Sequence, residues 1–156
     1  MKTKKATFGA GCFWHVEETF RKLKGVVDTT VGYMGGNIKN PTYEQVCTDK
    51  TGYVEVVQIE YDPDEIDYES LLDTFWAIHD PTQLNRQVHD IGTQYRSIIF
   101  YHDTCQKNTA IKSKSEQEKK NKKRIVTEIS KATMFYKAEE YHQRYLEKRG
   151  TFSCNI

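Results

Sequence analysis

Hydrophobic and polar residues follow two different periods along the chain, and their alternation predicts the elements of a mixed fold. Strands are expected where β-branched and aromatic residues gather, and helices where apolar residues recur every three or four positions. The predicted strands are 5–8, 26–33, 54–61, 96–101 and 125–129, and the predicted helices are 12–24, 68–79, 104–124 and 139–148. The order β-α-β-β-α-β, with an added helix, strand and irregular C-terminal tail, predicts an α+β fold with a ferredoxin-like split βαβ core.

The length of the chain fits one folded unit. A chain of 156 residues encloses a single hydrophobic core, and the sequence contains neither an internal repeat nor a linker-like stretch. We therefore expect 1–156 to form one domain, in which 149–156 is a mobile tail because no helical or strand pattern holds it.

Charge and hydrophobicity argue against nucleic acid and membranes as partners. Lys and Arg number 23 and Asp and Glu number 22, which gives a formal net charge of +1. The basic stretch 112–124 lacks the interleaved aromatic residues of a nucleic-acid surface and is typical of a solvated helix face. Apolar runs fall short of the roughly 18 residues of a membrane span, and the N-terminus lacks a secretory apolar segment. We expect a cytoplasmic monomer.

The spacing of cysteine and histidine residues argues against a metal site. The chain has four cysteines, Cys12, Cys47, Cys105 and Cys154, with no Cys-x-x-Cys pair, and its five histidines show no ligand spacing. Reduced thiols in a reducing compartment fit this pattern better than a disulfide framework. The question is then which thiol is reactive.

Cys12 lies where a glycine turn leads from a predicted strand into a predicted helix. Its sulfur is expected near free backbone N–H groups and the positive end of the helix dipole, a setting that favours the nucleophilic thiolate. The alternative is a buried structural cysteine. Trp14 stands off the apolar stripe of this helix, so it is available as an aromatic wall for a small group such as a methyl on sulfur.

Glu55 is the second informative position. It shares one strand face with Val57 and Ile59, so a carboxyl group is in phase with apolar residues. Burial would raise its pKa and keep a proton available for general acid catalysis. The alternative is a carboxylate at the end of the strand that faces water.

Further candidates lie in loops and in the tail. Tyr43 and Tyr95 fall in or beside loops, where a phenol can donate a hydrogen bond to an oxygen that gains negative charge. Cys154 on the tail can reach a distant partner, and it could condense with Cys12 to a disulfide if Cys12 became a sulfenic acid. The alternative is a terminal thiol without a role. Cys47 is interpreted as structural, and Cys105 keeps a competing setting at a helix start.

Several separate motifs make the chain resemble the A-type peptide-methionine sulfoxide reductase family. The stretch Gly11-Cys12-Phe13-Trp14 is similar to the signature around that family's nucleophile. Further blocks match in the same order at 32–36, 41–47, 79–82 and 92–97. The likeness runs from Thr7 to the tail, and several independent blocks are far more specific than one short motif.

The resemblance implies a role for each matched residue. Cys12 would attack the sulfoxide sulfur, and Glu55 would protonate the sulfoxide oxygen, which Tyr43 and Tyr95 would also hydrogen-bond. Phe13 and Trp14 would form a pocket for the sulfur-bound methyl group, and Asp90 would help to position the substrate. The single domain would then be catalytic, with Cys154 as the resolving thiol.

The resemblance also implies substrate and partner. The substrate would be the S epimer of methionine sulfoxide, either in proteins or as the free amino acid. No metal or organic cofactor would be needed, and thioredoxin would supply the electrons that regenerate the enzyme. Two stretches depart from the family pattern, Tyr53-Val54 before Glu55 and Val88-His89 before Asp90, and the tail replaces the usual Gly-Tyr-Cys-Gly.

Two other classes of function remain open at this point. A cysteine acyl-transfer or hydrolytic enzyme would need one of three histidines, His15, His79 or His89, within hydrogen-bond reach of Cys12. A non-enzymatic binding module would dock an acidic partner on the polar helix 104–124 and would not need Cys12.

Overall fold

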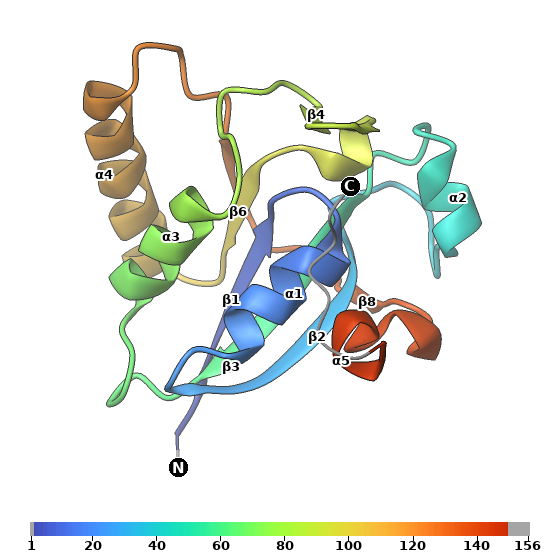
Figure 1. Cartoon of the computed structure of the whole chain (residues 1–156), viewed down its shortest axis with the longest axis horizontal. Coiled ribbons are helices and arrows are strands. Elements are labelled where there is room, and N and C mark those ends of the chain that lie inside the picture. Colours follow the sequence, from blue (N-terminus) through green and yellow to red (C-terminus); the bar gives the residue numbers. More distant parts are fainter. Residues whose placement is uncertain (1, 150–156) are drawn as a thin grey trace.

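The structure is a computed structural model that describes residues 2–149, and a six-stranded sheet forms its centre (Figure 1). The strand order is β7-β6-β1-β3-β2-β8, with β6 and β7 parallel and the other neighbours antiparallel. The strands are β1 (Lys4–Gly9), β2 (Val26–Met34), β3 (Val54–Tyr61), β6 (Ile98–Tyr101), β7 (Glu128–Lys131) and β8 (Tyr136–Lys137). The inner order β6-β1-β3-β2 and its strand directions confirm the ferredoxin-like prediction.

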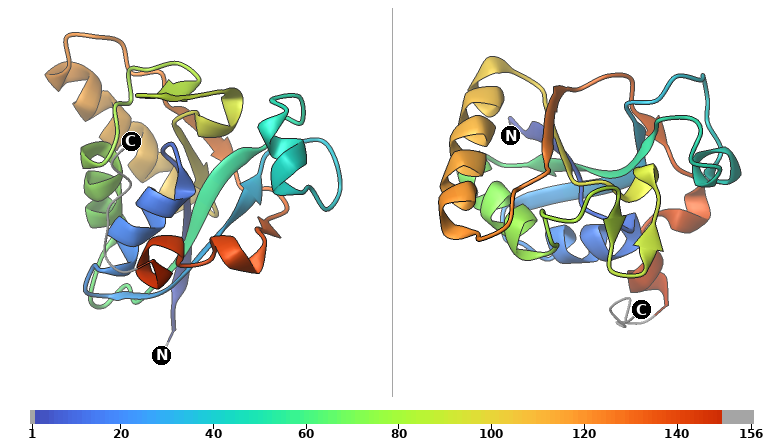
Figure 2. Two further views of the ribbon diagram at one scale, coloured as in Figure 1. Left: turned by 45° about the vertical axis from the view of Figure 1, so that its right-hand side comes forward. Right: turned by 90° about the horizontal axis from the view of Figure 1, so that it is seen from above.

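Helices cover one face of this sheet. The helices α1 (Phe13–Arg21) and α3 (Tyr68–Ala77) lie on that face, and α4 (Thr104–Lys120) packs beside α3 and the β6 edge (Figure 2). The core between these layers is rich in aromatic rings, because Phe8 of β1 contacts Phe20, Tyr68 and Phe75 at centroid distances of 5.2 to 6.0 Å. The two crossover helices are thereby joined to the central strand.

The opposite face has a smaller core. Met34, Val54 and Phe100 are buried there, and Phe135 from the connection between β7 and β8 packs over them. Gly32 permits this covering, because a Cβ atom at that position would lie 2.4 Å from the carbonyl oxygen of Tyr136. Both faces of the central strands are therefore shielded from water.

Side-chain caps set the start of several helices. Asp67 accepts a hydrogen bond from the backbone of Ser70 at the start of α3, and Asp103 caps α4 in the same way. Thr42 and Gln45 form a reciprocal capping box at α2 (Tyr43–Cys47). This box allows a helix of only five residues to hold its place in a long loop.

Several sequence predictions need correction at the level of single elements. The predicted helix 139–148 is wrong as one helix: it divides into η2 (Glu140–His142) and α5 (Tyr145–Lys148), because Arg144 adopts a left-handed conformation with φ of 51°. The last predicted strand lies at 128–131 instead of 125–129, and the predicted helix 104–124 ends at Lys120. Five short elements had no prediction: α2, β8, the two strands β4 (Arg86–Gln87) and β5 (Asp90–Ile91), which form a hairpin, and η1 (Thr93–Tyr95).

The predicted tail at 149–156 lies outside the described residues except for Arg149. Among residues 2–149, no helix is both long enough and apolar enough to cross a membrane. The same part of the chain has no cluster of three or more His, Cys, Asp or Glu side chains that could hold a metal ion.

Candidate active site

Cys12 is the N-cap residue of α1 and follows directly on the turn after β1. Gly11 makes this turn with a φ of 98°, and a Cβ atom there would lie 3.0 Å from Cγ of Gln87 in the β4–β5 hairpin. Cys12 is half-buried and lines a pocket of about 200 Å³. The predicted position at the amino end of a helix is confirmed.

Glu55 lies in β3 with its carboxyl group next to the start of α1. Only 1% of the residue is exposed, so the interpretation as a strand-end carboxylate facing water is wrong. Its Oε1 atom accepts a hydrogen bond from the backbone N–H of Phe13 at 3.3 Å, and Oε2 has no hydrogen-bond partner among the described residues. Burial raises the pKa of Glu55 to about 8; the Phe13 hydrogen bond opposes this rise and the charge of Asp90 adds to it. The group is therefore protonated at neutral pH.

Two phenols belong to the same electrostatic cluster. Burial raises the pKa of both Tyr43 and Tyr95, and the electrostatic interaction with the Glu55 carboxyl group, once it is ionised, is the next largest cause for each. Asp90, Cys47 and Cys12 also raise the pKa of Tyr95. Both side chains are thus neutral hydrogen-bond donors at physiological pH.

Asp90 and Tyr95 come from the loop between α3 and β6. Asp90 opens β5 and pairs with Gln87 of β4, and burial raises the pKa of its carboxyl group. Tyr95 ends η1, whose first residue Thr93 donates from its backbone and its hydroxyl group to Asp49. This loop therefore contributes side chains to the site.

Phe13 and Trp14 form an aromatic wall together with the C-terminal part of the chain. The Trp14 indole N–H donates to Nδ1 of His142 at 2.9 Å, and its ring stacks on Tyr145 at a centroid distance of 3.8 Å. His142 also contacts the rings of Phe13 at 5.1 Å and Tyr43 at 4.5 Å. Since Nδ1 accepts this bond, the neutral ring carries its proton on Nε2.

The segment 138–145, here named the C-terminal clamp, holds His142 in place. Glu139 accepts hydrogen bonds from the Tyr33 hydroxyl and the Tyr43 backbone, each at 3.0 Å. The Gln143 side chain accepts from the backbone N–H of Val31 and donates to its carbonyl oxygen, both at 2.9 Å. Burial lowers the pKa of His142, so its ring stays neutral and able to accept.

Sequence reasoning missed His142 as a member of the site. Histidines were weighed only as metal ligands or as bases for Cys12, and His142 is neither. The available signal was the resemblance of the segment that contains it, His142-Gln143-Arg144-Tyr145, to the family.

The histidine arrangement bears on the alternative of a cysteine hydrolase. His79 uses both ring nitrogens, one with the carbonyl oxygen of Phe75 at 2.6 Å and one with the Ser97 hydroxyl at 2.7 Å. Burial lowers the pKa of His79 to about 4, while the Phe75 hydrogen bond and the charge of Asp80 oppose this shift. His79 therefore has no ring nitrogen to serve as a base for Cys12, although both residues line the same pocket.

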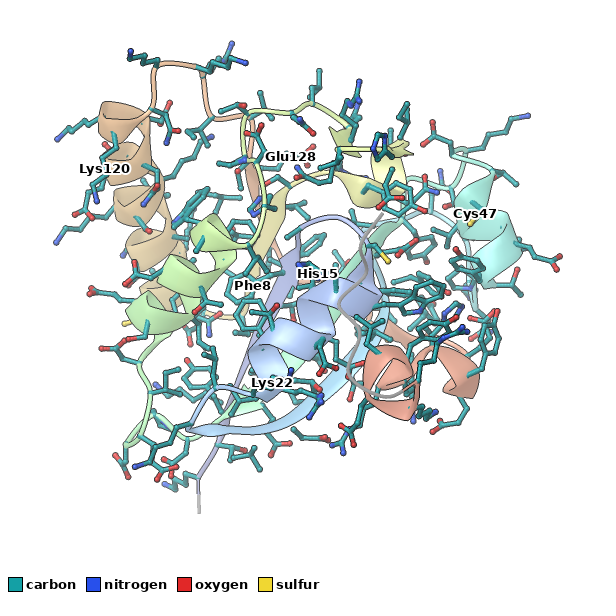
Figure 3. All side chains as sticks on the ribbon, viewed as in Figure 1. Phe8, His15, Lys22, Cys47, Lys120 and Glu128 are labelled. Carbon is teal, nitrogen blue, oxygen red and sulfur yellow. The ribbon has the colours of Figure 1, made fainter. Side chains whose placement is uncertain are left out.

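The other cysteines occupy different surroundings. Cys47 is exposed on α2, at the right of the view in Figure 3. Partial burial of its sulfur raises the pKa of the thiol, and a hydrogen bond with Tyr43 opposes this rise. Cys105 is exposed on α4, on the other side of the molecule. Cys154, predicted as the resolving thiol, lies outside the described residues.

The sequence profile of the family described as "Peptide methionine sulfoxide reductase" matches residues 4–156. The chain is also 59% identical over 154 residues to "Peptide methionine sulfoxide reductase MsrA" of Methanothermobacter thermautotrophicus, covering 97% of this chain and 91% of that protein. The chain belongs to the peptide methionine sulfoxide reductase family.

Solved structures agree with this membership of the peptide methionine sulfoxide reductases. Mxr1 of Saccharomyces cerevisiae in its reduced form superposes with a TM-score of 0.92 at 39% identity, covering 99% of this chain and 90% of that one. Mxr1 in complex with Trx2 matches with a TM-score of 0.67 at 30% identity, covering 92% of this chain and 85% of that one. The resemblance noted from the motifs is confirmed.

Proposed function

We propose that this protein reduces the S epimer of methionine sulfoxide, in proteins and as the free amino acid, by attack of Cys12 on the sulfoxide sulfur. One observation carries this most directly. The buried Glu55 carboxyl group, protonated at neutral pH, lies against the N–H of Phe13, the residue that follows Cys12. A proton donor thus stands beside the predicted nucleophile, and its Oε2 atom is available to a ligand.

The reaction needs both halves of this pair. A sulfoxide oxygen leaves sulfur only if it is protonated, so Glu55 acts as general acid while Cys12 forms the new sulfur–sulfur contact. Tyr43 and Tyr95 donate hydrogen bonds to the same oxygen as its negative charge grows. The sulfur–sulfur bond then breaks as the hydroxyl group passes from the substrate sulfur to Sγ of Cys12. The products are methionine, reduced by two electrons, and the sulfenic acid of Cys12, oxidised by two electrons.

The aromatic wall would bind the methyl group on the substrate sulfur. Phe13 and Trp14 offer ring faces to the methyl group, and the hydrogen bond from Trp14 to His142 fixes the indole plane. Asp90 orients the substrate from the hairpin side, where its carboxyl group raises the pKa of Glu55.

Recycling completes the cycle. Cys154 condenses with the sulfenic acid of Cys12, which releases water and forms a disulfide. Thioredoxin then reduces the disulfide to two thiols, a partner supported by the complex between the related yeast protein and Trx2. The protein works in this proposal as a single catalytic domain and a monomer in the cytoplasm, where it repairs oxidised methionine in proteins.

The test uses dithiothreitol as reductant, so that it does not depend on thioredoxin. The protein is incubated with separated S and R epimers of a blocked methionine sulfoxide, and the thioether is followed by chromatography. We expect turnover of the S epimer alone, and none with the Cys12→Ser variant. Failure to turn over either epimer, or equal turnover by the Cys12→Ser variant, would reject the proposal.

A further inference from the structure

The Cys12 pocket extends away from the aromatic wall toward the β4–β5 hairpin. Cys12 is one of its lining residues, and Ala10, Ile78 and Val88 contribute apolar surface to it. The methyl-binding residues Phe13 and Trp14 are absent from its lining. The pocket therefore offers space next to the reacting sulfur that the proposed mechanism does not use.

Val88 occupies an unusual position in this wall. It stands in the two-residue turn between the paired residues Gln87 and Asp90, with a φ of 55° and 56% of its surface exposed. A β-branched residue rarely adopts this left-handed conformation, because its side chain crowds the backbone. Strained backbone of this kind is found most often at sites where function requires it.

Hydrogen bonds on both sides keep Val88 in this conformation. Its backbone N–H donates to the side chain of Gln83 at 2.9 Å, and its carbonyl oxygen accepts from Arg86 at 2.6 Å. The neighbouring Gln87 side chain bonds both the N–H and the carbonyl oxygen of Asp80, at 2.9 and 2.7 Å. Gln87 also packs against Gly11, so the Val88 wall has a fixed position relative to Cys12.

The charges around the pocket restrict what can enter it. Asp80 and Asp90 line it together with the apolar residues. The Thr82 hydroxyl, which donates to Asp80 at 2.6 Å, lowers the pKa of this carboxyl group and keeps it charged. An acidic side chain would be repelled, while an uncharged apolar side chain would cover the exposed part of Val88.

We propose that the space between Cys12 and Val88 is a subsite for an apolar side chain adjacent to the oxidised methionine in a polypeptide. The inference rests on the proposed reductase function and specifies its substrate. A side chain that contacts Val88 during the reaction at Cys12 must belong to the same peptide as the sulfoxide. Free methionine sulfoxide has no neighbouring residue to supply such a side chain. The enzyme therefore favours peptides with apolar residues beside the sulfoxide over the free amino acid and over peptides with acidic neighbours.

The experiment compares three substrates with dithiothreitol as reductant: a blocked tripeptide with leucine on both sides of methionine S-sulfoxide, the same peptide with glutamate on both sides, and free methionine S-sulfoxide. Val88→Asn keeps a side chain of similar size that tolerates the left-handed conformation but removes its apolar surface. Leu84→Asn is the matched control, because Leu84 is 67% exposed nearby and does not line the pocket.

We expect Val88→Asn to lower kcat/KM for the leucine peptide by about three- to tenfold, the value of covering one small apolar side chain. The other two substrates should change less than about twofold, within the range of surface substitutions. Leu84→Asn should leave all three unchanged.

Several outcomes would overturn the subsite while leaving the reductase intact. These are an equal loss for all three substrates, an equal effect of Leu84→Asn, or a Val88→Asn defect seen only when thioredoxin replaces dithiothreitol, which would assign the wall to the reductant. Absence of turnover by the unmodified protein on every substrate would instead reject the reductase function itself.

Discussion

Two regions hold the candidate site, and they are built in opposite ways. The C-terminal clamp reaches back to the first third of the chain, through contacts such as Trp14 with His142 and Val31 with Gln143, which are 128 and 112 positions apart. The side-chain hydrogen bonds of the β4–β5 hairpin join residues two to seven positions apart, such as Gln83 with Val88. The clamp buries Ala138, His142 and Gln143, whereas the hairpin exposes Val88 and Ile91.

The two regions are expected to tolerate substitutions differently. Long-range buried contacts form together and depend on one another, because a lost partner leaves polar groups unpaired away from water. Local contacts at the surface form independently, so a hairpin residue can vary without disturbing the sheet. Substitutions in the clamp are therefore expected to disturb the geometry of the site, whereas exposed residues of the hairpin can be replaced without disturbing it.

The largest effect is expected at Glu55, which accepts a hydrogen bond from the residue after Cys12 and lies in the field of Asp90 of the hairpin. We expect Glu55→Gln to lower kcat/KM by about 10² to 10⁴, because the variant has no proton to give to the leaving oxygen. For the unmodified protein, the raised pKa means that the acid form is complete well below pH 8 and is lost as the pH rises through about 8. Rates measured with dithiothreitol from pH 6 to pH 9.5 should show this alkaline decline. A variant with full activity, or with the same decline, would contradict the assignment.

The stability of the two regions should differ next. Gln143→Leu leaves the N–H group of Val31 without a partner, while the carbonyl oxygen of Val31 keeps its bond from the Ala138 N–H; we expect a loss of about 2 to 3 kcal/mol in the free energy of unfolding. The matched hairpin change Gln87→Leu should lose about 1 kcal/mol, because Asp80 lies nearer to water. Urea unfolding followed by circular dichroism measures both, and equal losses would remove the contrast between the regions.

A smaller effect on binding is expected at His142. Replacing it by Phe keeps a ring in the cluster but removes the acceptor for the Trp14 N–H, so we expect KM for the sulfoxide to rise about tenfold with a smaller change in kcat. His142→Asn retains an acceptor and should recover part of this loss. In a Trp14→Phe background the two His142 variants should have the same KM, and a remaining difference would show that His142 acts by another route.

The smallest effect concerns the turn itself. Val88→Gly removes the strain of the left-handed residue but increases the freedom of the unfolded chain, so the two terms nearly offset each other. We expect the free energy of unfolding to change by no more than about 1 kcal/mol, in contrast to Gln143→Leu. Thermal unfolding by calorimetry tests this, and a loss above about 2 kcal/mol would show that the hairpin supports the core.

Site residues that are marked by a local sequence pattern could be predicted from the sequence. Cys12 follows a glycine turn into a helix, and Glu55 interrupts an apolar strand face; both lie where these patterns predict. The inner strands and the two crossover helices were also found, because long periodic segments carry a strong signal.

Other parts of the site could not be found in this way. The role of His142 depends on a partner 128 positions away, which no local period reveals. Strands of two residues show no alternation, so the sequence carried no prediction for the β4–β5 hairpin. Arg144 has no helix-breaking side chain, and its left-handed backbone follows from the hydrogen bond that its N–H donates to Glu17 at 2.7 Å.

The distance along the chain between Trp14 and His142 also orders events during synthesis. Proteins emerge from the ribosome amino end first, and local segments begin to fold before later ones exist. The strand and helix around Cys12 are therefore made early, whereas the aromatic wall behind Trp14 is complete only after His142 and Tyr145 have been added and docked. In the nascent chain the thiol of Cys12 is therefore present before the aromatic wall that would hold the methyl group of the substrate.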